Sequence, residues 1–492
     1  MVRRLLKLLG TLVAAAALVL ATVVLLRAFD ARSRGPLKPW HTVSPASEVR
    51  AAELDGRFTL AQYLAREEAV FREVRTRVEE AVAPEDRTAG NRYWSEGPLN
   101  PSGILPDGNR TFELVPETVR GGVLLLHGLT DAPYSMRRLA EVYRDLGYRA
   151  LALRLPGHGT VPGALVDASW RDQAAAARVG ARHVRARLGP GMPFHVVGYS
   201  NGGALALDYA LDALGQPDLP RPDRLVLVSP MVGVARAAGL AKALGLLGVF
   251  PYFETSRWLD VMPEYIPFKY VSFPVNAAAQ TAELTETIRL KLSRLAARGD
   301  VARLPPILAF ASLVDATVRT DATVRDLYER LGSNGSALVL FDLNRSATVG
   351  PFLKRRDERL LDALLPRRAR PWDLAIVTNA GPQSREVVER RTPAGTDEPV
   401  DTPLGLAWPD GFYSLSHVAL PFPPDDPLYG GVPPAPGAAF AFNLGTLQPR
   451  GERGVLTVPV EQLVRLTWNP FFPYLEERVR SWAAIAPAAP AP

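Results

Sequence analysis

A serine lies at the centre of the sequence GYSNG (198–202), between an apolar run and a helical pattern. Residues 194–197 predict a short strand, and leucines recur at helical spacing over residues 207–214. A G-x-S-x-G pattern between a strand and a helix is typical of a sharp turn that exposes the serine hydroxyl, with glycines where side chains would collide. Ser200 is therefore a candidate nucleophile, and a plain glycine-rich turn is the alternative interpretation.

A serine hydroxyl needs a general base, and that base needs a partner that fixes its tautomer. Five of the six histidines have a structural interpretation. His41 lies near the N-terminal segment, His183 on an Arg-rich helix and His195 inside the serine strand. His127 and His158 lie in His-Gly turns. The remaining one, His417, lies in the loop SLSHV (414–418), beyond the last predicted strands. We expect His417 to be the base.

Carboxylates that follow a strand are candidates for the acid, since functional groups gather beyond the carboxyl ends of parallel strands. Asp315 comes just after the apolar strand 307–311 and is the preferred acid. Asp342 ends the next strand and is the runner-up, whereas Asp321 is expected to cap the following helix.

Two backbone amides are expected to form an oxyanion hole, which stabilises the charge that develops on the attacked carbonyl. One amide belongs to Asn201, directly after the serine. The other belongs to Leu129, in the loop that follows the apolar strand 123–126. Gly128 would let this backbone approach the reacting group closely.

Strands and helices alternate between residues 111 and 230, which predicts a mainly parallel α/β sheet with helices on both faces. The predicted strands are 111–115, 123–126, 148–155, 194–199 and 225–228, and the helices are 133–146, 170–188 and 203–214. Two stretches interrupt this order. Residues 231–304 predict a helical cap or lid, with an apolar segment at 239–253, and residues 343–410 predict a second, polar insertion with one strand at 374–378.

The composition is that of a globular protein: 492 residues, 47% hydrophobic and 22% charged, with a net charge of +6. The excess of basic residues is spread along the chain without aromatic interleaving, so nucleic acid is not an expected partner. The chain has no cysteine, which excludes disulfides, thiolate metal sites and a cysteine nucleophile. No metal or cofactor is implied.

The N-terminus begins with basic residues and continues with an uncharged apolar run at 8–26. A helix of this length, at about 1.5 Å per residue, approaches the ~30 Å thickness of a bilayer core. We expect an uncleaved signal anchor at 1–30 that places the catalytic domain outside the inner membrane. A cleaved signal, which would give a secreted form, stays the alternative.

Together the segments LLLHGLTDAPYS (124–135), RLPGHGT (154–160), GYSNGG (198–203) and SHVALPF (416–422) resemble the α/β-hydrolase superfamily. Within it, the chain is most similar to serine esterases and monoacylglycerol-lipase-like lysophospholipases, over about 110–330 and 411–485. In this superfamily the order Ser, acid, His is usual, which agrees with Ser200, Asp315 and His417. The spacing between Asp315 and His417 is longer than usual for the family.

The resemblance implies hydrolysis of carboxylic esters, among them lipid acyl esters, without a cofactor. An acyltransferase on the same fold and a non-catalytic binding scaffold are the alternatives, and the oligomeric state is open. The expected organisation follows the chain: anchor 1–30, tether and helical segment 31–110, core 111–230, cap 231–304, acid strand 305–342, second insertion 343–410, and His loop with C-terminal helix 411–485.

Overall fold

The computed structural model describes residues 36–104, 106–233, 251–346, 350–354, 360–433, 440, 443–447, 449–450, 455–463, 465 and 467–484, with isolated positions before residue 36. The predicted anchor and most of the apolar cap segment 239–253 lie outside these residues. Among the described helices, none combines the length and the apolar character needed to cross a membrane.

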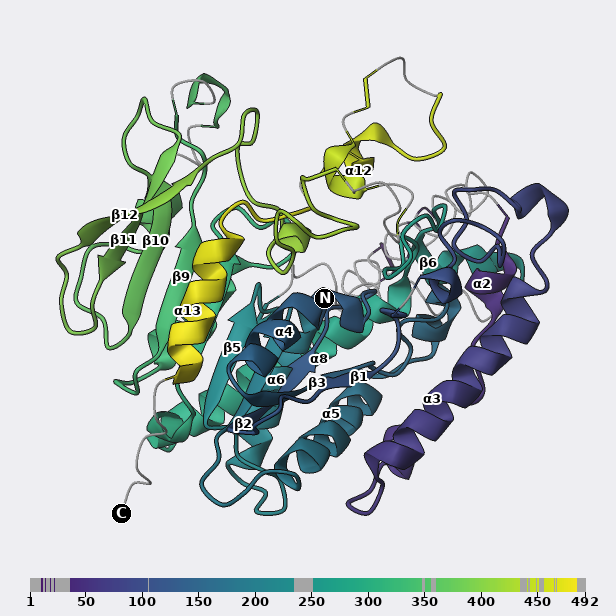
Figure 1. Cartoon of the computed structure of the whole chain (residues 1–492), viewed down its shortest axis with the longest axis horizontal. Coiled ribbons are helices and arrows are strands. Elements are labelled where there is room, and N and C mark those ends of the chain that lie inside the picture. Colours follow the sequence, from purple (N-terminus) through teal and green to yellow (C-terminus); the bar gives the residue numbers. More distant parts are fainter. Residues whose placement is uncertain are drawn as a thin grey trace.

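One ten-stranded sheet organises the chain, in the order β1-β3-β2-β4-β5-β8-β9-β10-β11-β12 (Figure 1). The seven strands from β3 to β10 in this order run parallel, and β1, β11 and β12 pair antiparallel. The strands are β1 (Phe112–Leu114), β2 (Gly121–Leu126), β3 (Tyr148–Leu153), β4 (Phe194–Tyr199), β5 (Arg224–Val228), β8 (Ile307–Ser312), β9 (Ala337–Phe341), β10 (Asp373–Asn379), β11 (Glu386–Thr392) and β12 (Val400–Ala407). A separate pair is β6 (Trp258–Asp260) with β7 (Phe273–Pro274).

Helices cover both faces of the sheet, which confirms the predicted α/β class. Alternate residues of β2 show the two layers: Leu124 and Leu126 pack in the cluster that holds α5, α6 and α8, whereas Val123 and Leu125 pack in the cluster that holds α4 and α13. The helices are α2 (Pro39–Thr42), α3 (Leu60–Val74), α4 (Arg137–Asp145), α5 (Trp170–Arg185), α6 (Asn201–Ala213), α8 (Val275–Ala297), α9 (Thr320–Ala322), α11 (Leu360–Leu364), α12 (Val460–Leu463) and α13 (Phe472–Ala484).

The segment 343–410 is expected from its sequence to be an insertion with a single strand, and the structure differs from this expectation. It contributes β10, β11 and β12, which extend the main sheet and lie at the opposite end of the molecule from α3 in Figure 1. The outer strand β12 is mostly exposed, and β11 buries few of its side chains. Because so few of these residues are apolar and buried, the hydrophobic alternation that marks a strand is weak in this part of the sequence.

Part of the predicted cap is also a core element. The helix α8 buries Leu284, Ile288 and Leu292 in the same cluster as α5 and α6. The Nζ atom of Lys291 on α8 lies 2.7 Å from Asp208 Oδ1 on α6, so the two helices are joined by a part-buried ion pair. Only the residues before α8 are therefore free to form a cap over the sheet edge.

The described part of the predicted tether, residues 36–57, packs against the body of the protein. Trp40 and His41 are buried, and Glu48 accepts two hydrogen bonds from the guanidinium of Arg154, at 2.9 and 3.1 Å. Glu67 on α3 receives a third bond from Arg154 at 3.3 Å. The tether prediction is wrong for these residues, because one buried arginine of the core fixes both the N-terminal segment and α3.

Candidate active site

Ser200 lies between β4 and α6 in a backbone conformation that side-chain-bearing residues rarely adopt, with φ 56° and ψ −117°. The two flanking glycines make this turn possible. A Cβ on Gly198 would lie 2.2 Å from the carbonyl oxygen of Gly202, and a Cβ on Gly202 would lie 2.0 Å from the carbonyl oxygen of Leu126. The turn is therefore as sharp as the motif predicts, and the strain at a serine favours a functional role.

His417 and Asp315 are joined by a hydrogen bond of 2.8 Å between Nδ1 and Oδ2. Both side chains are buried, with 5% and 1% of their surfaces exposed. The other oxygen of Asp315 accepts from the amides of Thr317 and Val318 at 2.7 and 2.8 Å. With Nδ1 donating to the carboxylate, Nε2 of His417 carries the lone pair that a general base uses.

Several opposing influences act on the carboxylate of Asp315. Burial raises its pKa, whereas the hydrogen bond and charge of His417 and the two backbone amides lower it, and the net pKa lies below the ordinary value. Asp315 is therefore held in the ionised form that stabilises a protonated imidazole.

The loop that carries His417 is fastened to the ends of two strands. Ser312, the last residue of β8, donates from Oγ to the carbonyl of Leu415 at 3.0 Å. Asn344, which follows β9, donates its amide and side-chain nitrogens to the carbonyls of Tyr413 and Phe412 at 2.9 and 2.8 Å. These bonds place the imidazole beside the acid strand.

The runner-up acid has other partners. Asp342 receives two bonds from the guanidinium of Arg345, at 2.7 and 2.9 Å, and one from Thr378 Oγ1 at 2.8 Å. Asp321 pairs with the neighbouring Arg319. Neither carboxylate contacts a histidine in the described structure.

The other histidines have structural contacts. His127 Nε2 accepts from the amide of Leu155 at 3.0 Å, and burial lowers its pKa well below the usual value. Burial also lowers the pKa of His158 to about 4, of His195 to about 3 and of His41 to about 4. The Nε2 atom of His183 lies 3.1 Å from Glu113 Oε1, and the side chain is only 11% exposed.

The two expected oxyanion donors are Leu129, which lines the same cavity as Ser200, and Asn201, which follows the serine at the start of α6. Within the described part of the chain, the backbone amides of Leu129 and Asn201 donate to no other group. Gly128 approaches the serine so closely that an added Cβ would lie 3.2 Å from Ser200 Cβ. The side chain of Asn201 donates to Gln173 Oε1 at 3.0 Å, which holds it away from the reacting face.

A cavity of about 480 Å³ brings these groups together, since Leu129, Ser200 and His417 all line it. Among the described residues, Ser200 and His417 line the same cavity, and no hydrogen bond joins the serine hydroxyl to the imidazole. Apolar side chains line much of the remaining wall: Met231, Tyr265, Ile266, Phe273, Val418 and Leu444. The arrangement can activate a hydroxyl next to an apolar binding space.

Sequence reasoning missed two cationic residues at this cavity, Lys269 and Arg465. Lys269 Nζ lies 3.6 Å from Oδ2 of the buried Asp131, whose pKa is raised by burial. No local motif marks either cation, because each reaches the site from a segment far from the serine in sequence. Among the described residues, no group of three His, Asp or Glu side chains is arranged to hold a metal ion.

Residues 117–343 match the family model described as serine aminopeptidase, S33. The chain is 32% identical over 176 residues to the thermostable monoacylglycerol lipase of Bacillus sp. (strain H-257), over 35% of this chain and 65% of the lipase, which is a little under two thirds of that relative.

Two solved structures are similar in fold. One is a metagenome-derived lipolytic enzyme (24% identity, 49% of this chain, 89% of that chain, TM-score 0.39). Another is the Paleococcus ferrophilus monoacylglycerol lipase (18% identity, 47% of this chain, 88% of that chain, TM-score 0.35). With its parallel sheet and its strand-serine-helix turn, the chain has the α/β-hydrolase fold, and residues 117–343 are similar to the serine aminopeptidase, S33, family.

Proposed function

We propose that this protein hydrolyses carboxylic esters through an acyl-enzyme on Ser200. The observation that carries the proposal is the buried hydrogen bond between His417 and Asp315 at the edge of the cavity that holds Ser200. A base with a fixed tautomer that lines the same cavity as a serine is the arrangement that nucleophilic catalysis needs.

In the proposed reaction, His417 Nε2 takes the proton of Ser200 Oγ as the oxygen attacks the ester carbonyl. The carbonyl oxygen becomes an oxyanion between the amides of Leu129 and Asn201, each worth about 3–4 kcal/mol of transition-state stabilisation. The imidazolium, stabilised by Asp315, then gives its proton to the alcohol oxygen as the C–O bond breaks. Water repeats the sequence on the acyl-enzyme and releases the acid.

The apolar wall of the serine cavity supports an acyl chain as the part of the substrate bound there. The similarity to a monoacylglycerol lipase over 176 residues supports the same class of ester. We therefore propose a lipid acyl ester as the substrate.

We further propose that the apolar run 8–26 anchors the protein in the inner membrane with the catalytic domain on the outer side, near a lipid substrate. Membrane fractionation of the full chain and of a variant without residues 1–35 tests this. An intact chain that leaves the membrane with salt alone would contradict an anchor, and a chain that starts near residue 30 after export would indicate a cleaved signal.

The full chain in detergent, assayed with p-nitrophenyl esters of short and long acids, tests the reaction. We expect turnover that Ser200→Ala removes, and labelling of the wild type by a fluorophosphonate at Ser200. Turnover unchanged by Ser200→Ala would refute the proposal, and absence of labelling would favour a non-catalytic scaffold. Faster ester formation than hydrolysis when an alcohol is supplied would assign the protein as an acyltransferase.

A further inference from the structure

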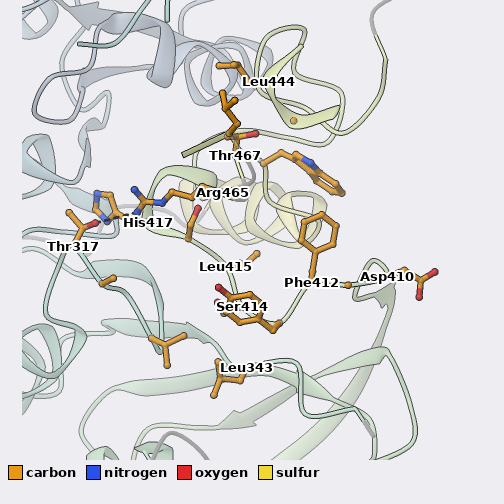
Figure 2. Close-up of a pocket in the computed structure, with 18 of the residues that line it drawn as sticks. Thr317, Leu343, Asp410, Phe412, Ser414, Leu415, His417, Leu444, Arg465 and Thr467 are labelled. Carbon is orange, nitrogen blue, oxygen red and sulfur yellow. Dashed lines mark hydrogen bonds between the residues drawn. The ribbon is translucent and has the colours of Figure 1, made fainter. Parts of the chain in front are cut away.

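A second cavity of about 800 Å³, whose lining residues are drawn in Figure 2, adjoins the serine cavity. The two share part of their walls, namely Thr317, His417, Leu444, Leu463, Arg465 and Thr467. Ser200 and Leu129 line the first cavity and do not line the second. The second continues from His417 along the loop 410–416 and toward Leu343 and Trp468. The imidazole of His417 therefore lies at the boundary between the serine cavity and the second cavity.

The chemistry of ester cleavage assigns different halves of the substrate to the two cavities. The acyl carbon must reach Ser200 Oγ and its carbonyl oxygen must reach the oxyanion amides, and both Ser200 and Leu129 line the first cavity. The alcohol oxygen must receive its proton from the imidazole as it leaves. The alcohol half then extends past His417, which is the direction of the second cavity.

Positive charge dominates the second cavity. Arg465 and Lys354 both line it, and neither has a carboxylate within ion-pair distance in the described part of the chain. The polar contact that the structure gives Arg465 is with Thr317 Oγ1, at 3.4 Å. The acidic residue of this cavity, Asp410, is paired with Arg385.

Arg465 also faces the first cavity, whose charged lining residues are Lys269 and Asp260. Lys269 forms an ion pair with Asp131, and Asp315 is hydrogen-bonded to His417. In Figure 2, the guanidinium of Arg465 lies beside the ring of His417 and near Thr317. A cation at this boundary is within reach of a group a few atoms beyond the ester oxygen.

We propose that Arg465 recognises an anionic group, a phosphate or a carboxylate, on the alcohol half of the ester. The inference rests on the proposed ester hydrolysis and names its substrate class. A guanidinium presents a planar fork of donors that matches both anions, and such charge-assisted bonds are stronger than neutral ones. Lys354 adds charge further along the same cavity.

Esters that differ only in the alcohol half test the proposal with the full chain in detergent. The set consists of octanoyl glycerol, octanoyl glycerol 3-phosphate and octanoyl glycerate, which share one acyl group. We expect kcat/KM for the anionic esters to exceed that for octanoyl glycerol by about tenfold or more, and to fall at high salt. Whichever of the two anionic esters has the higher kcat/KM identifies the preferred anion as a phosphate or a carboxylate.

Three variants assign the preference to Arg465. Arg465→Gln should lose it, because kcat/KM for the anionic esters should fall about tenfold more than kcat/KM for octanoyl glycerol. Arg465→Lys should retain part of it, since lysine keeps the charge without the fork. Arg289→Gln is the matched control, because Arg289 is an exposed arginine on α8 that pairs with Glu286 and lines neither cavity.

Equal rates for neutral and anionic esters in the wild type would overturn the proposal, as would an Arg465→Gln loss that is the same for all three esters. Either result would leave the hydrolase assignment intact if Ser200→Ala abolished the turnover of octanoyl glycerol. Failure of the wild type to cleave any ester and to react with a fluorophosphonate would instead refute the proposed function, and this inference with it.

Discussion

Asp315 Oδ2 and His417 Nδ1 lie 2.8 Å apart although 102 positions separate the two residues in the chain. Between them the chain forms β9 to β12 and returns to the carboxyl end of β8. The bond from Ser312 to Leu415 closes this long excursion beside the acid. The long spacing therefore accommodates additional sheet strands without moving the histidine away from its partner.

Asp315→Asn tests which carboxylate orients His417. An asparagine amide can donate to Nδ1 and stabilise the wrong tautomer, so we expect kcat to fall by about 10³–10⁴-fold. The matched variant is Asp342→Asn. It removes the charge that pairs with Arg345 and leaves the hydrogen bond between Asp315 and His417 intact. Ester turnover measured per folded protein should be close to wild type for Asp342→Asn. A larger loss there than for Asp315→Asn would assign the acid to Asp342.

The strain at Ser200 predicts a difference between two inactive variants. Glycine accepts a φ of 56° without a steric penalty, whereas alanine does not. We expect Ser200→Gly to unfold with a free energy about 1 kcal/mol higher than Ser200→Ala, measured by urea denaturation. Equal stability of the two, or a less stable glycine variant, would mean that the turn is not strained in solution.

Gly202 has no room for a side chain, while Gly215 after α6 does. The nearest atom to a Cβ on Gly202 is the carbonyl oxygen of Leu126 at 2.0 Å, and on Gly215 it is Asp212 O at 3.9 Å. We expect Gly202→Ala to lower the melting temperature by several degrees and to abolish fluorophosphonate labelling, since the elbow must shift. Gly215→Ala should change neither, and normal labelling of Gly202→Ala would contradict the geometry.

Arg154 is 1% exposed and holds two carboxylates, Glu48 and Glu67. Replacing it with methionine leaves both carboxylates buried without a cation, so we expect a loss of about 3–5 kcal/mol in the free energy of unfolding. Limited proteolysis should then cut first within residues 36–57. The triple variant Arg154→Met with Glu48→Gln and Glu67→Gln should recover part of the stability. No recovery would show that packing of the arginine, and not charge, dominates.

Asp426 predicts a pH dependence of stability. Burial raises its pKa to about 6, although it accepts from the amides of Leu428 and Tyr429 and from the hydroxyl of Tyr134. Because the folded state then binds a proton more tightly than the unfolded state, this group lowers the free energy of unfolding as pH rises from about 4 to 6. Below about pH 4 this carboxyl is protonated in both the folded and the unfolded state, so it no longer makes the free energy of unfolding depend on pH.

Asp426→Asn removes this titration while Oδ1 can still accept from both amides. We expect the stability of the variant relative to the wild type to increase by about 2–3 kcal/mol between pH 4 and pH 7. Urea denaturation at four pH values measures this difference. A constant difference across the range would mean that the carboxyl titrates normally.

The sequence by itself determined the local parts of the site. The strand, serine and helix around Ser200 are adjacent in the chain, so periodicity and two glycines were enough to predict the turn. His417 followed from its position as the histidine C-terminal to the serine, and Asp315 from the end of an apolar strand. The parallel core was equally readable, because strands buried on both faces are continuous apolar runs.

The tertiary structure decided what depends on distant segments. The strand β12 exposes most of its side chains and β11 buries only two, so their pairing with the main sheet leaves little hydrophobic pattern in the sequence. Residues 36–57 are held partly by Arg154, which lies more than a hundred positions away from its partner Glu48. Arg465 likewise lines the same cavity as Ser200 although the two residues are far apart in the chain. A local hydrophobic pattern predicts which face of a helix or strand is buried, but it does not predict which other element covers that face.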